Sequence, residues 1–138
     1  ERTRLLYKGL VDAHNRIRSQ ISAAEDHYLS QAIDTVIKSA RVNVDDFLDT
    51  LPLSESLKEQ INQSVSILLP DREFAIDEQF AQQLTQKRYF RGDFGLRIAI
   101  QAAQYDQVVE SVEYVNEPGE PPYYRVVLRT EKWDEVLR

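Results

Sequence analysis

The stretch Lys87-Arg-Tyr-Phe-Arg-Gly-Asp-Phe-Gly-Leu-Arg-Ile-Ala-Ile-Gln101 divides the chain into two kinds of sequence. From Leu96 onward the large apolar residues Leu96, Ile98 and Ile100 alternate with Arg97, Ala99 and Gln101, and a period of two predicts a β-strand. Before it, apolar residues recur in the steps of three and four that are typical of helices. The sequence therefore predicts an α+β fold, with a helical part at about 1–86 and a sheet part at about 87–138.

One apolar stripe near the amino terminus predicts a long helix from Leu5 to about Ala40. The stripe repeats after eleven residues, a spacing that suits a nearly straight helix better than a coiled coil. The polar segment Glu25–His27 leaves open a break into two shorter helices. The stripe residues Leu6, Leu10, Ile17 and Ile21 form a candidate interaction surface, because a helix of this length would exceed what so small a domain can cover.

Shorter helices are expected over residues 43–51, 54–69 and 77–84. Ser54 and Asp77 can each accept a hydrogen bond from a backbone N–H of the first helical turn. Phe74 and Ile76 alternate like a brief extended segment between the last two of these helices.

The sheet part predicts three strands, at about 96–101, 108–115 and 124–128. The Pro- and Gly-rich residues 116–122 form a loop between the last two. We expect one three-stranded, mostly antiparallel sheet packed on the helices. A short helix should then begin at Glu131, with one apolar side formed by Trp133, Val136 and Leu137.

Length and composition restrict the class of protein. The 138 residues suit a single domain, 1–138, and no apolar run is long enough to span a membrane. The absence of cysteine excludes disulfides, thiolate metal sites and a cysteine nucleophile. Because the sequence contains no methionine, we expect a piece of a longer protein. The absence of cysteine is compatible with the reducing interior of a cell, so we expect the protein in the cytoplasm.

No residue pattern predicts an enzyme. The two histidines, His14 and His27, do not occur in a metal-binding spacing, and the four glycines form no phosphate-binding motif. The triplet Asp93-Phe94-Gly95 matches a kinase motif, but the chain has no room for a kinase fold. We therefore predict no catalytic residue, no metal and no cofactor.

Cations and aromatic residues gather just before the first predicted strand. Guanidinium groups can bind phosphates and rings can stack on bases, so we predict DNA contacts by Lys87, Arg88, Tyr89, Arg91 and Arg97. The net charge of −6 argues against binding over the whole surface. The alternative is a structural loop in which Phe94 is buried and the cations are simply solvated. In both cases Arg88 and Arg91 should be exposed.

A second hypothesis assigns the chain to protein–protein interaction. Self-association through Leu6, Leu10, Ile17 and Ile21 would cover the apolar stripe of the long helix. A homo-oligomer or another protein partner is then expected instead of DNA.

The order of elements resembles the carboxyl-terminal region of bacterial nucleoid-associated proteins of the YejK or NdpA type. The resemblance rests on Val44-Asp-Asp-Phe47, Leu57–Val65, Phe74–Leu84, Gly95–Ile100, Val112–Tyr114 and Tyr124–Leu128 with Trp133–Val136. It covers about two thirds of the chain, by order of elements. It implies a non-enzymatic domain that associates with DNA at the nucleoid, and it supplies no catalytic residues.

Overall fold

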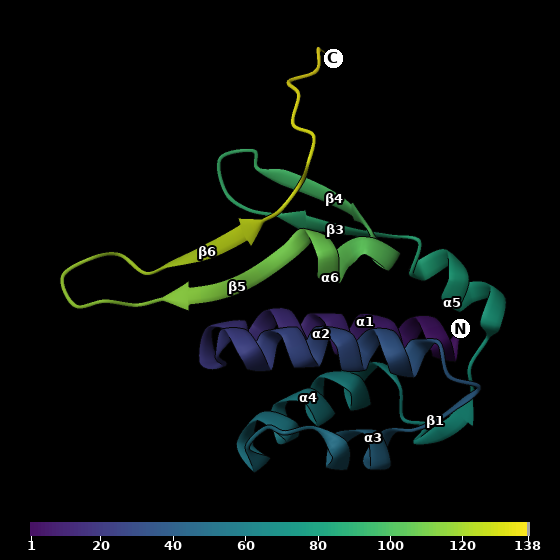
Figure 1. The fold of residues 1–138 in the computed structure, drawn as a ribbon. Helices are drawn as coiled ribbons and strands as arrows, with labels where there is room; N and C mark the ends of the chain where they lie inside the picture. Colours follow the sequence, from purple (N-terminus) through teal and green to yellow (C-terminus); the bar gives the residue numbers. More distant parts are fainter. Residues whose placement is uncertain (138) are drawn as a thin grey trace.

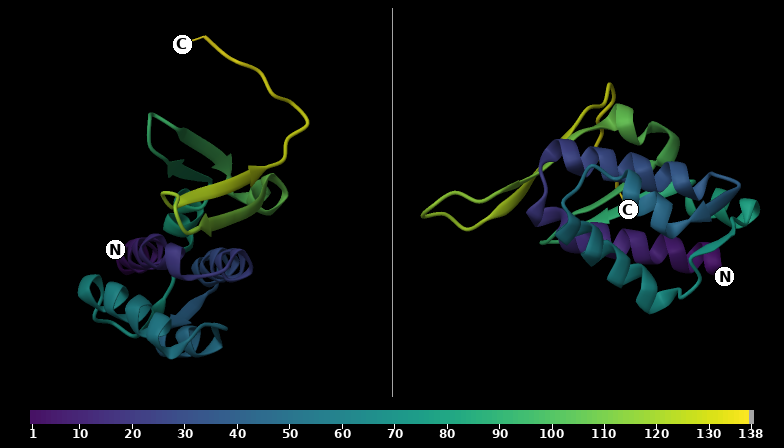
Figure 2. Two further views of the ribbon diagram at one scale, coloured as in Figure 1. Left: turned by 90° about the vertical axis from the view of Figure 1, so that its left-hand side faces the viewer. Right: turned by 90° about the horizontal axis from the view of Figure 1, so that it is seen from below.

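The computed structural model describes residues 1–137 and shows three layers (Figure 1). Helices α1 (Arg2–Ile17) and α2 (Ala23–Ile37) lie side by side in the middle. Helices α3 (Val44–Thr50) and α4 (Glu55–Leu68) lie on one side of them, and β-hairpins cover the other side. Figure 2 shows the same order of layers from the end of the helices. The α+β class predicted from the sequence is confirmed.

The predicted single helix from Leu5 to Ala40 is wrong, because the chain reverses direction between α1 and α2. A 3₁₀ turn, Arg18–Gln20, follows α1, and Ser22 then begins α2. The Ser22 hydroxyl accepts a hydrogen bond from the Glu25 N–H, while the Glu25 carboxylate accepts one from the Ser22 N–H. This reciprocal capping box starts a new helix, three residues before the break that the polar segment indicated.

The predicted interaction surface is part of the core. Leu6, Leu10, Ile17 and Ile21 are between 0% and 8% exposed, because α4 packs along α1. The two helices approach so closely that a Cβ added at Gly9 would lie 3.0 Å from the Cα of Val65. The apolar stripe thus needs no second chain to cover it.

The short elements of the helical part follow the predicted caps. Ser54 caps α4, Asp77 caps α5 (Glu78–Leu84), and each accepts a hydrogen bond from the backbone N–H three residues later. Strands β1 (Arg41–Asn43) and β2 (Glu73–Ala75) pair antiparallel, with Val42 opposite Phe74. Both side chains are buried, so this small sheet closes the core that α1 to α4 share.

The other strands form two separate hairpins and not the predicted three-stranded sheet. In one, β3 (Lys87–Arg91) pairs with β4 (Arg97–Gln101), and in the other β5 (Val109–Val115) pairs with β6 (Tyr123–Leu128). The residues of β3 were expected to form a loop, but they form a strand that pairs with one edge of β4. Between the hairpins the chain forms a 3₁₀ turn, Ala102–Gln104, and the short helix α6 (Tyr105–Val108). A small second core of Ile100, Tyr105 and Val109 joins them.

The predicted helix from Glu131 to Arg138 is absent over residues 131–137, where the chain forms neither helix nor strand, and Arg138 lies outside the described residues. Trp133, Val136 and Leu137 are each at least 73% exposed. So short a helix needs a surface on which to bury its apolar side, and none lies next to it. Within residues 1–137, no helix combines the length and the apolar character that a membrane span requires.

Candidate nucleic-acid interface

The β3–β4 hairpin separates its side chains onto two faces. In the antiparallel register, Lys87 lies opposite Gln101, Tyr89 opposite Ala99, and Arg91 opposite Arg97. Alternate residues of a strand share a face, so these six side chains lie together, and all of them are exposed. The outer face of the hairpin, defined by these residues, carries four of the five predicted DNA contacts.

Arg88, the fifth predicted contact, lies on the inner face. Its Nη1 donates a hydrogen bond of 2.7 Å to the Ser30 hydroxyl of α2. Its guanidinium also lies over the rings of Tyr105 and Phe90, at 3.9 and 5.2 Å from their centroids. Arg88 is therefore half-buried between the hairpin and the helices, whereas Arg91 is exposed as expected.

The tip of the hairpin overturns the prediction that Phe94 is a core residue. The turn is closed by hydrogen bonds from the Gly92 N–H to the Leu96 carbonyl and from the Leu96 N–H to the Asp93 carbonyl, both 3.0 Å long. It extends beyond the last cross-strand pair, so nothing covers the Phe94 ring, which is 101% exposed. Phe94 and Gly95 both have positive φ angles, of 53° and 80°.

The cations of the hairpin keep their charges unneutralised. Among residues 1–137, no carboxylate lies within 4.0 Å of the cationic nitrogens of Lys87, Arg88, Arg91 or Arg97. The acids Asp45 and Glu113 are paired with other arginines. Arg72 bonds to Asp45 at 2.6 Å and holds the pKa of that carboxyl below its usual value. Arg125 pairs with Glu113 at 3.2 Å.

A cleft of about 780 Å³ lies behind the hairpin, between β3 and the α1–α2 pair. Its lining includes Tyr7, His14, Arg18, Ser30 and Arg88. The sequence pattern did not predict this cleft, because one long helix was expected where α1 and α2 fold against each other. The Ser-x-x-Glu spacing of Ser22 and Glu25 is the signal that could have revealed the turn and hence the cleft.

A buried ionic cluster lies at the closed end of the α1–α2 pair. Asp26 Oδ1 accepts hydrogen bonds from His14 Nε2 at 2.7 Å and from Arg18 Nε at 3.0 Å. Burial lowers the pKa of His14, and the positive charges of Arg18 and Arg88 lower it further. The hydrogen bond to Asp26 raises this pKa, but by less than the other effects lower it. Burial alone would raise the pKa of Asp26, but the bonds and charges of His14 and Arg18 lower it overall.

No group of three or more His, Cys, Asp or Glu residues between positions 1 and 137 could hold a metal ion. His27 lies 4.0 Å from Asp106 and is half-exposed, away from the His14 cluster.

Comparison with known proteins supplies no further assignment for this site. The chain matches no protein-family model, no curated protein and no solved structure, and its resemblance to bacterial nucleoid-associated proteins therefore stays a prediction.

Proposed function

We propose that the chain is a non-enzymatic bacterial domain that associates with duplex DNA at the nucleoid, in the cytoplasm, through the outer face of the β3–β4 hairpin. The observation that carries the proposal is the set of three exposed, unneutralised cations on that one face, Lys87, Arg91 and Arg97. A two-stranded ribbon fits into the major groove of B-DNA. The exposed rings of Tyr89 and Phe94 extend the same surface.

The charge distribution favours weak binding that is confined to the hairpin. The protein has a net charge of −6, and this negative charge opposes the approach of phosphates to the surface as a whole. Arg88 faces inward, so three cations and not four remain for the phosphates. The slope of log affinity against log salt concentration should then be about −2.7.

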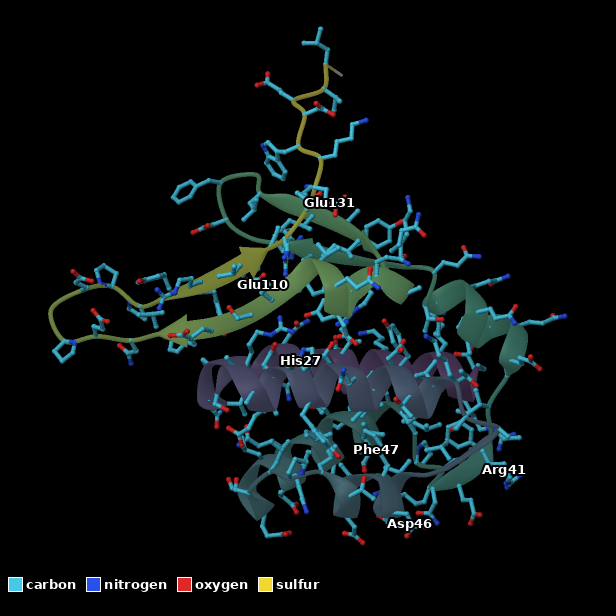
Figure 3. The ribbon with its side chains drawn as sticks, in the orientation of Figure 1. His27, Arg41, Asp46, Phe47, Glu110 and Glu131 are labelled. Atoms are coloured by element: carbon cyan, nitrogen blue, oxygen red, sulfur yellow. The ribbon has the colours of Figure 1, made fainter. Side chains whose placement is uncertain are left out.

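The test is the fluorescence anisotropy of a labelled duplex, titrated with the chain over a series of salt concentrations. Arg91→Gln and Arg97→Gln should each weaken binding about equally for unrelated duplex sequences and make the salt slope shallower by about 0.9. The matched control is Arg41→Gln, since Arg41 is an exposed cation in the helical part, far from the hairpin (Figure 3).

Two results would overturn the proposal. The first is no binding by the wild-type chain at low salt. The second is an equal loss of affinity in Arg41→Gln and Arg97→Gln, because a diffuse electrostatic attraction would not distinguish the hairpin from the rest of the surface.

A further inference from the structure

Arg88 combines partial burial with an uncompensated charge. Charged groups inside proteins are normally paired with an opposite charge, because transfer from water to a less polar surrounding is costly. The partners of Arg88 are a neutral hydroxyl, Ser30 Oγ, and the faces of two aromatic rings. Within residues 1–137, Ser30 is the one hydrogen-bond acceptor of this guanidinium, and its other N–H groups are not buried and can bind a ligand.

The surroundings of Arg88 offer space for a ligand. The cleft of about 780 Å³ next to it is in the range of small-molecule sites. Polar side chains from several elements line it, among them Tyr7 and Asn15 on α1, Ser30 on α2, and Gln101 on β4. Asp34 is the acid in the lining, and it is already paired with Lys38 at 2.9 Å.

The charges of the cleft select the class of ligand. Arg18 also lines the cleft, but its charge is compensated by Asp26. Two lining cations, Lys87 and Arg88, remain without a carboxylate partner. A phosphate monoester carries a charge of about −1.5 to −2 at neutral pH, which matches two cations better than a carboxylate does. A guanidinium can also bind two phosphate oxygens at once.

We propose that the cleft between β3 and the α1–α2 pair binds a phosphate group, anchored by Arg88 and supported by Lys87. The two proposed sites differ in Arg88, which faces the helices, and they share Lys87, which lines the cleft and also lies on the outer face of the hairpin. Free phosphate, a nucleoside monophosphate and the terminal phosphate of a DNA strand share this chemistry, and the experiment distinguishes them.

The experiment is a titration of the full chain followed by backbone amide NMR. The probes are inorganic phosphate, adenosine monophosphate, adenosine, acetate, and a short single strand with and without a 5′-phosphate. The phosphate-bearing probes should shift the amides of Ser30 and of residues 86–90, and adenosine and acetate should not. Equal affinities for phosphate and the monophosphate identify a site for the phosphate group alone. Tighter binding of the monophosphate or of the phosphorylated strand identifies the larger ligand.

Variants test the anchoring role of Arg88. Arg88→Gln should weaken phosphate binding about tenfold or more, Arg88→Lys should retain part of it, and Arg41→Gln should not change it. If Arg88→Gln does not fold, Arg88→Lys and the amide shifts of the wild-type chain decide the question.

The inference is overturned if phosphate shifts no amide of the cleft, if acetate binds as tightly as phosphate, or if folded Arg88→Gln binds as the wild type does. Duplex binding without phosphate binding refutes this inference alone, and phosphate binding without duplex binding refutes the proposed function alone.

Discussion

Removing the Asp26 carboxylate should strongly destabilise the protein. Asp26 and His14 have side chains that are 4% exposed, and that of Arg18 is 16% exposed. Asp26→Ala leaves an imidazole and a guanidinium without their common acceptor. Breaking a buried ionic pair by deleting one partner typically costs about 3–5 kcal/mol. We expect about 3 kcal/mol, because the guanidinium of Arg18 can still reach some water.

The measurement is urea unfolding at neutral pH, followed by far-UV circular dichroism. Asp34→Ala is the matched control, since Asp34 is an aspartate of the same helix whose partner, Lys38, is half-exposed. Loss of such a surface pair should cost less than about 0.5 kcal/mol. The expected role of Asp26 is refuted if Asp26→Ala lowers the free energy of unfolding by less than about 1 kcal/mol, or by no more than Asp34→Ala does.

Three further predictions concern pH and single side chains. Burial lowers the pKa of His14 from its ordinary value of 6.5, so its contribution to stability is complete above pH 6.5 and declines as the pH falls toward the lowered pKa. Unfolding midpoints of His14→Gln should lack this decline below pH 6.5, whereas those of the His27→Gln control should keep it. Phe94→Ala should change the free energy of unfolding by less than about 0.5 kcal/mol, because the ring is fully exposed; a loss of about 3 kcal/mol would show that the ring is covered. Gly9→Ala should lower the free energy of unfolding, measured in urea, by about 1 kcal/mol or more, because the new Cβ would meet the Val65 backbone. This clash should outweigh the higher helix propensity of alanine, which by itself would stabilise the helix by about 1 kcal/mol. Stabilisation by Gly9→Ala would refute the close packing of α1 on α4.

Local signals in the sequence predicted much of the fold. Ser54 and Asp77 mark the starts of α4 and α5, because a cap depends on a side chain and a backbone N–H only three residues apart. The alternation that begins at Leu96 identified β4 for a similar reason. Contacts between residues that are close in sequence can thus be predicted without knowledge of the tertiary structure.

Choices between distant partners could not be predicted in the same way. The strand pairing depends on the path of the chain through α6, and alternation alone does not say that β4 pairs with β3 and not with β5. The position of Arg88 illustrates the limit for the candidate site. The sequence placed it in a basic cluster, but its contact with Ser30 exists only because α2 folds back beneath the hairpin.

The division of the apolar residues into two clusters has a consequence for cooperativity. The large cluster joins α1 to α4 with the β1–β2 pair, whereas the small one holds the hairpins through Ile100, Tyr105 and Val109. Regions with fewer buried contacts open at lower free energy. Amide hydrogens of the hairpins should therefore exchange through partial unfolding, whereas those of the helices should exchange only through global unfolding. The hairpins can thus adjust their shape to a bound molecule while the helices keep theirs.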